Sequence, residues 1–408
     1  MNDLRIRLER LEARLEELAQ IGALPGGGVS RLALTEADKA ARDRVVRWME
    51  DLQLTVSIDR IGNVVGTRRG RIDGPGLIMG SHIDTVATGG IYDGNLGVLA
   101  GLEVIETLAD ARRETERSVS VAFFTNEEGA RFAPDMMGSG VHQGALDLDA
   151  MLAVRGIDGV TVGDQLRAIG YAGNTPCGGV RASHYLELHI EQGPVLEQRD
   201  VTIGAVEGVQ GISWSEFRVQ GVSNHAGTTP MGARHDAGFV ATELAGFVRR
   251  LALEFGGDQV ATVGALQLEP NLINVIPERA TFSVDLRNTD DTLLREAESR
   301  TFARAEELAV QEGVTLERRE LARFTPVAFD ADMIALVESQ ARTLGHSVRR
   351  MPSGAGHDAQ MFAPHSKVAM IFVPSRGGIS HNVEEYTSPS DLEAGANVLL
   401  QSALVCAG

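Results

Sequence analysis

Apolar residues recur with helical spacing near the start of the chain. Five leucines from Leu4 to Leu18 follow one another at alternating steps of four and three residues, which predicts an amphipathic helix with one apolar stripe. A second helix is predicted from about Thr35 to Leu52, because Thr35 and Asp38 form a Thr-x-x-Asp capping signal. Both helices are expected to pack on a core.

Apolar runs typical of buried strands then alternate with helical stretches. Strands are expected at residues 64–70, 76–82, 118–128, 184–193 and 367–374, and helices at about 96–108, 332–344 and 390–405. Strands joined by crossover helices favour an α/β fold with a mostly parallel sheet covered on both faces. Such a sheet binds its ligands beyond the carboxyl ends of its strands.

The middle of the chain has a different order of elements: strand, helix, two strands, helix, strand. The strands are expected at 212–221, 260–270, 278–288 and 314–322, and the helices at about 233–255 and 292–312. This βαββαβ order is typical of a ferredoxin-like domain. We therefore predict an inserted domain over residues 208–324, and a larger catalytic domain formed by residues 1–207 and 325–408.

Length and charge narrow the class of function. A chain of 408 residues, 43% of them hydrophobic, is long enough for two domains. Its formal net charge of -18 disfavours nucleic acid and anionic membrane surfaces as partners. A small-molecule substrate is favoured.

The chain shows no signal for secretion or membrane insertion. Its first twenty residues are charged throughout, and no apolar run reaches 18 residues. The cysteines Cys177 and Cys406 lie far from the histidine and carboxylate motifs, so neither a disulfide framework nor a thiolate metal site is indicated. A cytoplasmic location is expected.

Two neighbouring carboxylates, Glu127 and Glu128, close the apolar strand SVSVAFFTNEEG. Neighbouring carboxylates at a strand end repel each other unless a cation neutralises them. The motifs SHIDT and GGIYDGNLG lie upstream and add a histidine and further aspartates. The pattern indicates a hydrolytic metal site.

Five side chains in all end a predicted strand or lie in the loop after one. The candidate ligands are His82, Asp93, Glu128, His189 and His381. A bridging Asp93 with two ligands on each side would hold two metals about 3.5 to 4 Å apart, an arrangement that activates water. Nitrogen and oxygen ligands without sulfur suit zinc, and manganese, cobalt or nickel would also be held.

Two further carboxylates have predicted roles beside the metals. Asp84 could accept a hydrogen bond from the second imidazole nitrogen of His82 and fix its tautomer. Glu127 is then left without a metal, and a free carboxylate beside the activated water is the natural general base.

The ordered motifs SHIDT, YDGNLG, NEEG, HIEQGP, NHAGTTPM, NVIP, VDLRN, GAGHDA and GISHN resemble the hydantoinase/carbamoylase branch of the di-zinc amidohydrolases, relatives of aminoacylase and carboxypeptidase G. The resemblance runs from about residue 60 to 390. It implies the same five metal ligands, Glu127 as the catalytic base, and an inserted domain that serves as lid and dimerisation unit. His357 of GAGHDA is expected to lie behind the ligands.

The resemblance also implies which residues hold the substrate. They are Gln192, His225, Asn274, Arg287 and Gly356. The Arg287 guanidinium could bind an amino-acid carboxylate through two parallel hydrogen bonds, and His225 could stabilise the oxyanion. In this family that histidine enters the active site of the partner subunit, so a homodimer is expected.

The substrate class follows from the same branch, which cleaves N-carbamoyl-L-amino acids, N-carbamoyl-β-alanine or allantoate. Its allantoate-handling members look as though they carry two arginines where this chain has Ser213 and Trp214. That difference favours an N-carbamoyl-L-amino acid hydrolase. Allantoate amidohydrolase, β-ureidopropionase, a peptidase or N-acyl-amino acid deacylase, and a catalytically silent binding protein remain alternatives.

Overall fold

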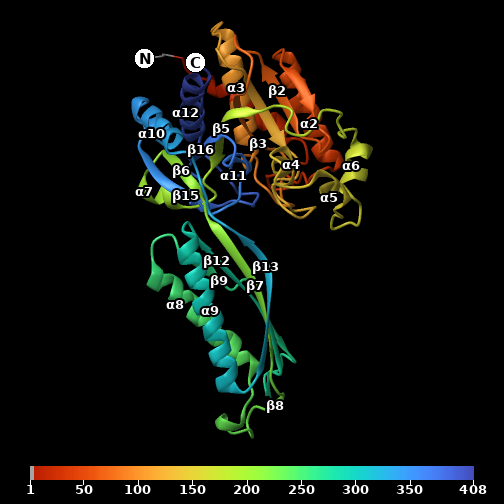
Figure 1. Cartoon of the computed structure of the whole chain (residues 1–408), viewed down its shortest axis with the longest axis vertical. Coiled ribbons are helices and arrows are strands. Elements are labelled where there is room, and N and C mark those ends of the chain that lie inside the picture. Colours follow the sequence, from red (N-terminus) through yellow and green to blue (C-terminus); the bar gives the residue numbers. More distant parts are fainter. Residues whose placement is uncertain (1–3) are drawn as a thin grey trace. The chain divides into compact units, whose positions relative to one another are not determined.

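The computed structural model describes residues 4–408, which fold into two compact units. The first unit comprises the residues up to Gly208 together with Ala328–Gly408, and the second is Val209–Val327. In Figure 1, the elements labelled α8, α9, β7, β8, β9, β12 and β13 belong to the second unit, and the other labelled elements belong to the first. Each unit is described by itself.

The first unit consists of a large sheet and its covering helices. Its helices are α1 (Leu8–Ala19), α2 (Glu36–Asp51), α3 (Asn95–Asp110), α4 (Met137–His142), α5 (Leu148–Ala153), α6 (Val162–Ile169), α7 (Val195–Arg199), α10 (Ala331–Thr343), α11 (Asp358–Phe362) and α12 (Pro389–Ala407), with the 3-10 turn η2 (Arg376–Gly378). Its strands are β1 (Thr55–Ile58), β2 (Val64–Arg68), β3 (Gly76–His82), β4 (Val119–Phe124), β5 (Ala182–Ile190), β6 (Ile203–Val209), β14 (Val327–Ala328), β15 (Val348–Ser353) and β16 (Lys367–Val373).

The strands are ordered β1-β2-β4-β3-β5-β16-β6-β14, and β15 pairs with β6. The central strands β4, β3, β5 and β16 run parallel to one another, which confirms the mostly parallel α/β fold. Every residue of β3 and β4 is buried, as expected for strands covered on both faces. The flanking pairs β1–β2, β2–β4 and β6–β16 are antiparallel, which the alternation of elements did not indicate.

The two N-terminal helices form where the pattern predicts them. The helix α1 buries Leu11, Leu15 and Leu18, although it begins only at Leu8. The helix α2 begins after Thr35, whose hydroxyl accepts a hydrogen bond from the backbone N–H of Asp38 at 3.3 Å.

The second unit has the expected βαββαβ order. Its elements are β7 (Gly211–Gln220), β8 (Asn224–His225), the turn η1 (Met231–Ala233), α8 (Ala237–Phe255), β9 (Val260–Thr262), β10 (Leu266–Glu269), β11 (Val275–Ile276), β12 (Arg279–Asn288), α9 (Asp291–Glu312) and β13 (Thr315–Phe324). The antiparallel sheet is ordered β10-β12-β7-β13. The expected strand 260–270 is interrupted, and its two parts, β9 and β10, both pair with β12.

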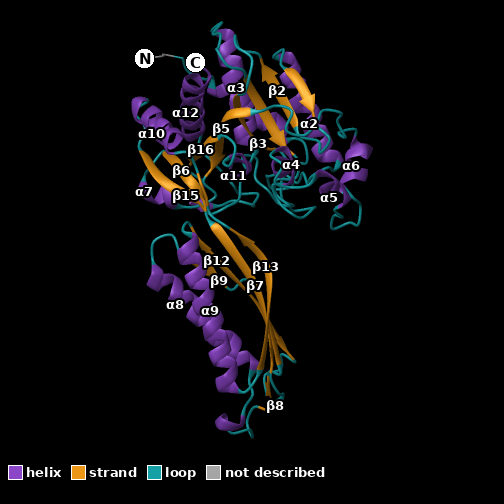
Figure 2. Ribbon diagram, viewed as in Figure 1, coloured by secondary structure: helices purple, strands orange, loops and turns teal. Residues whose placement is uncertain are grey.

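One face of this second sheet packs on helices α8 and α9, which lie together beside the strands in Figure 2. Phe217 and Phe282 stack between neighbouring strands, with ring centroids 5.3 Å apart, and belong to the buried cluster. Residues of β7 alternate between buried and more exposed positions along the strand. Among residues 4–408, no helix combines the length and the apolar character that crossing a membrane requires.

A buried ion pair anchors α2 in the first unit. Arg42 Nε donates to Asp38 Oδ2 at 2.8 Å, and both side chains are completely buried. Arg42 also donates to the carbonyl of Gly62 at 2.8 Å. On the same helix, Lys39 and Asp43 form an ion pair that solvent reaches.

Replacing Arg42 with methionine should therefore destabilise the protein much more than replacing Lys39. Arg42→Met leaves the Asp38 carboxylate buried without its counter-ion, which costs about 3–5 kcal/mol. Lys39→Met removes an exposed pair and should cost less than about 1 kcal/mol. Urea unfolding of the two variants measures the difference, and equal losses would show that the buried pair has no special role.

Candidate metal centre

The five predicted ligands gather at the carboxyl ends of the central parallel strands. His82 ends β3, His189 lies near the end of β5, and Glu128 follows β4. Asp93 lies just before α3, and His381 follows η2 beyond β16. Carboxyl ends of parallel strands share one edge of the sheet, so residues far apart in sequence meet there.

Asp93 lies between two groups of ligands. Its Oδ1 is 3.1 Å from His189 Nε2 and 3.6 Å from His82 Nε2. In the other group, Asp93 Oδ2 is 3.3 Å from His381 Nε2, which is also 3.3 Å from Glu128 Oε2. The ligand atoms thus form two trios that share Asp93.

The charges of the site fit a pair of cations. Burial raises the pKa of Glu127 well above its usual range, and the neighbouring Asp358 and Glu128 carboxyls raise it further. Burial also raises the pKa of Glu128, together with the charges of Asp93 and Asp84. Cations held by imidazole and carboxylate ligands would neutralise these groups, so the residues present suit a dinuclear centre.

Backbone carbonyls fix the tautomers of the two buried histidines. His82 Nδ1 lies 2.9 Å from the carbonyl oxygen of Asp84, and His189 Nδ1 lies 2.8 Å from that of Ile190. A carbonyl only accepts, so each Nδ1 carries the proton and each Nε2 presents its lone pair to the trio around Asp93.

The role predicted for the Asp84 side chain was wrong. The backbone carbonyl of Asp84, and not its carboxylate, contacts His82. The carboxylate instead accepts hydrogen bonds from the backbone N–H groups of Glu127 and Glu128, at 3.3 and 3.4 Å. Burial raises the pKa of Asp84 to about 7. Asp84 therefore orients the turn that carries both glutamates.

Glu127 lies beside the ligands without belonging to either trio. Its Oε2 is 3.3 Å from His82 Nε2, and its side chain is almost fully buried. A carboxylate in this position can take a proton from a water next to the metals.

Two of the predicted substrate residues lie at the same cavity. Gln192 Nε2 donates to Asp93 Oδ2 at 2.9 Å, while Gln192 Oε1 is buried without a partner among the described residues. Gly356 lines the cavity together with the ligands, and the cavity volume is about 130 Å³. His357 also lines this cavity, and its ring packs edge-on against that of His189 with ring centroids 4.6 Å apart.

The other three predicted substrate residues belong to the second unit. His225 forms part of the exposed strand β8, and its Nδ1 accepts from the backbone N–H of Gly227 at 3.0 Å. The Asn274 carbonyl accepts from the N–H of Ala226 at 3.0 Å. Arg287 is paired with Asp285, with Nη2 donating to Oδ2 at 2.9 Å.

Sequence reasoning missed a buried carboxylate behind the site. Glu187 accepts from the Ser81 hydroxyl at 2.7 Å and from the backbone N–H of Ala359 at 3.0 Å. It also forms a possible third ligand group with His189 and His357. Its place two residues before His189 on β5 was the only signal in the sequence.

Comparisons with known proteins agree along nearly the whole chain. Peptidase family M20/M25/M40 matches residues 78–404. The N-carbamoyl-L-amino-acid amidohydrolase of Rhizobium meliloti is 38% identical over 401 residues, which are 98% of this chain and 96% of that protein. The allantoate amidohydrolase of Bacillus subtilis (strain 168) is 34% identical over 388 residues, 94% of each chain. The crystal structure of a hydantoinase/carbamoylase family amidase from Burkholderia multivorans has 44% identity and a TM-score of 0.97, and the match covers 99% of this chain and 98% of that one.

The shared position of Asp93 predicts how metals stabilise the protein. Adding zinc to metal-stripped protein should raise the thermal midpoint, because a ligand at about 100 times its dissociation constant stabilises by roughly 2.7 kcal/mol. Asp93→Asn should remove most of this rise, since Asp93 belongs to both trios. The exposed Asp73 provides the control variant Asp73→Asn, which should keep the full rise. A rise of the same size in Asp93→Asn would contradict the bridging role.

Proposed function

Because the chain belongs to peptidase family M20/M25/M40, we propose that it hydrolyses the ureido C–N bond of N-carbamoyl-L-amino acids. One water is consumed, and the products are the free L-amino acid, ammonia and carbon dioxide. The observation that carries the proposal is the Asp93 carboxylate shared by two ligand trios, with Glu127 beside them. The similarity of the chain to an N-carbamoyl-L-amino-acid amidohydrolase, which extends over 98% of its length, supports this choice of substrate.

The family depends on metal ions, and we propose two per subunit. One would be held by His82, His189 and Asp93, and the other by Asp93, Glu128 and His381. Zinc suits these ligands best, although manganese, cobalt or nickel would also fit. When bound, two such ions act as Lewis acids that activate water and polarise the carbonyl group.

Glu127 would move the protons of the reaction. It takes a proton from the attacking water and returns it to the departing nitrogen, which is the general acid–base role of a buried carboxylate. The Asp84 carboxylate holds the backbone of this turn through the N–H groups of Glu127 and Glu128. The general base is therefore fixed before the substrate arrives.

Several polar groups would orient the substrate. Gln192 Nε2 is held by Asp93, which leaves Oε1 to accept a hydrogen bond from the ureido group. Arg287, whose guanidinium is oriented by Asp285, would bind the carboxylate of the amino acid. Asn274 would orient the ureido group, Gly356 would line the site, and His225 would stabilise the oxyanion.

Trp214 favours this substrate over allantoate. Ser213 is buried, whereas Trp214 is partly exposed, and the guanidinium carbon of Arg287 lies 5.9 Å from the centre of its ring. An aromatic surface next to the carboxylate-binding arginine suits an apolar amino-acid side chain better than a second polar ureido group. Allantoate and N-carbamoyl-β-alanine are the alternative substrates, followed by peptides and N-acyl-amino acids.

We further propose that the inserted unit serves as lid and dimerisation unit, and that each active site receives His225 of the partner subunit. Strand β10 is an edge of the second sheet, and edge strands readily pair with another chain. Exposed apolar side chains near this edge, including Leu266, Leu272 and Ile273, would be covered by a second copy.

We also propose that the protein acts in the cytoplasm. The free thiols of Cys177 and Cys406 suit this reducing compartment.

A substrate panel tests the proposed reaction. Ammonia release should be fastest with N-carbamoyl-L-amino acids that have apolar side chains, and slower with their D enantiomers, N-carbamoyl-β-alanine and allantoate. Chelation should abolish the activity, and divalent metal should restore it. Turnover of N-acetyl amino acids or dipeptides alone would favour the peptidase or deacylase alternative. No turnover of any of these substrates by the metal-loaded protein would favour a catalytically silent binding protein.

Mixing two inactive variants tests the cross-subunit role of His225. Glu127→Gln and His225→Ala should each lose at least about 100-fold in kcat as homodimers. A refolded equal mixture should recover about a quarter of wild-type activity, because half of the dimers are mixed and each has one intact site. Glu16→Gln on the exposed face of α1 is the control for Glu127→Gln. An inactive mixture would contradict the cross-subunit role.

A further inference from the structure

A buried carboxylate outside both trios joins the two loops that carry Asp93 and His381. Glu385 Oε1 accepts hydrogen bonds from the backbone N–H groups of Tyr92 and Asp93, at 3.2 and 3.1 Å. Its Oε2 accepts from the hydroxyl of Ser380, the residue before His381, at 3.0 Å. Glu385 is 6% exposed, so these contacts are shielded from water.

The Ser380 hydroxyl extends this link to the shared ligand itself. Its Oγ lies 3.2 Å from Asp93 Oδ2 and 3.0 Å from Glu385 Oε2, and its single proton can be donated to only one of them at a time. The Tyr92 ring also meets the Tyr386 ring edge-on, with centroids 6.2 Å apart. The loop of the bridging ligand is thus attached to the other loop by side chain and by backbone.

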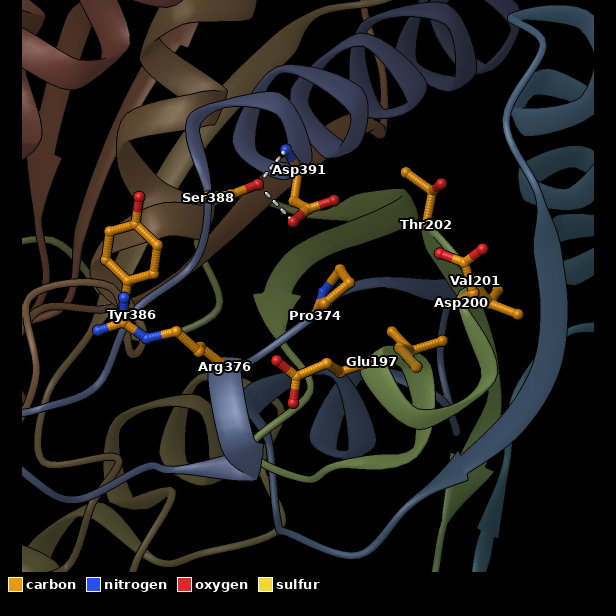
Figure 3. A pocket seen from close by; sticks show the side chains of 10 residues that line it. Glu197, Asp200, Val201, Thr202, Pro374, Arg376, Tyr386, Ser388 and Asp391 are labelled. Carbon is orange, nitrogen blue, oxygen red and sulfur yellow. Dashed lines mark hydrogen bonds between the residues drawn. The ribbon is translucent and has the colours of Figure 1, made fainter.

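The segment that carries Glu385 is itself anchored. The Thr387 hydroxyl donates to the carbonyl of Pro374 at 2.9 Å, and the Ser388 hydroxyl caps α12 by accepting from the N–H of Asp391 at 3.2 Å. The Arg376 guanidinium lies 4.2 Å from the centre of the Tyr386 ring. Figure 3 shows the Ser388–Asp391 hydrogen bonds, and Arg376 and Tyr386, on the left of the view, line the same pocket.

Gly90 shows how closely the Asp93 loop approaches this carboxylate. A Cβ atom at position 90 would lie 2.0 Å from Glu385 Oε1 and 2.4 Å from its Cβ. Only glycine leaves room for Glu385 to reach the two backbone N–H groups. The second glycine of GGIYDGN therefore has a packing reason connected with the candidate metal ligands.

We propose that Glu385 is a positioning residue that fixes the separation of Asp93 from His381, and thereby sets the affinity of the metal position formed by Asp93, Glu128 and His381. This inference rests on the proposed dinuclear centre and adds a determinant outside its ligands. His381 depends on this support more than the other histidines do, because its side chain is 49% exposed whereas those of His82 and His189 are buried. Hydrogen bonds around ligands commonly determine metal affinity in this way.

Metal titration of the folded, metal-stripped chain tests the proposal without any substrate. In equilibrium dialysis against zinc, Glu385→Ala should bind the second equivalent about 10- to 100-fold more weakly than the wild type, while the first changes much less. The affinity of Glu385→Gln for the second equivalent should lie between those of the wild type and Glu385→Ala. Its amide oxygen can still accept hydrogen bonds from both N–H groups, whereas its NH2 group faces Ser380. Glu384→Gln is the control, since Glu384 is the exposed neighbour in the same segment.

Amide hydrogen exchange supplies a second reading of the same contacts. Peptides that include Tyr92 and Asp93 should exchange faster in Glu385→Ala than in Glu384→Gln. Wild-type affinity for both equivalents in Glu385→Ala, or an equal loss in Glu384→Gln, would overturn the proposal. If Glu385→Ala does not fold, Gly90→Ala displaces the carboxylate while keeping it, and must then show the same loss of the second equivalent. A chain that binds metal as expected but cleaves no ureido substrate would contradict the proposed function alone.

Discussion

The site depends on how the protein keeps one buried carboxylate ionised among others that burial pushes towards the neutral form. Burial alone would raise the pKa of Asp93, but the neighbouring imidazole groups of His189 and His381 hold it well below its usual range. Glu127 and Glu128 lie in the same buried region, and their pKa values are raised. The carboxylate with the most imidazole partners is therefore the one that can be shared by two cations, which makes Asp93 the centre of the arrangement.

Backbone groups supply much of the precision around Asp93. Carbonyl oxygens set the tautomers of His82 and His189, and backbone N–H groups fix Glu127 on the Asp84 carboxylate. Gly94 illustrates the resulting crowding, because a Cβ atom there would lie 2.4 Å from the His82 ring, and its φ is +65°. The strand ends thus form a surface into which the ligand loops fit with little spare room, and a rigid sheet can hold this geometry before any metal binds.

The sequence predicts that the five candidate ligands lie together, because each ends a strand or lies in a loop after one and belongs to a motif; His82 ends β3, for example, and Glu128 follows β4. The sequence does not predict whether the carboxylate or the backbone carbonyl of Asp84 contacts His82. Both groups could reach the imidazole, and the conformation of the turn determines that the carbonyl does so. Glu385 lies 292 residues from Asp93, and no local pattern connects them. The mostly parallel sheet follows from alternating apolar runs, whereas its antiparallel margins depend on short connections that carry no periodic signal.

The division of residues between the two units has a consequence for how such an enzyme changes its substrate. All five candidate ligands and Glu127 belong to the first unit, which contains its own core and sheet. Trp214, Asp285 and Arg287 lie on neighbouring strands of the second unit, which has a buried cluster of its own. A substitution at Trp214 alters the surroundings of Arg287 without touching a ligand of the metals. Substitutions in the second unit can therefore alter the surroundings of Arg287 while the five candidate ligands stay unchanged.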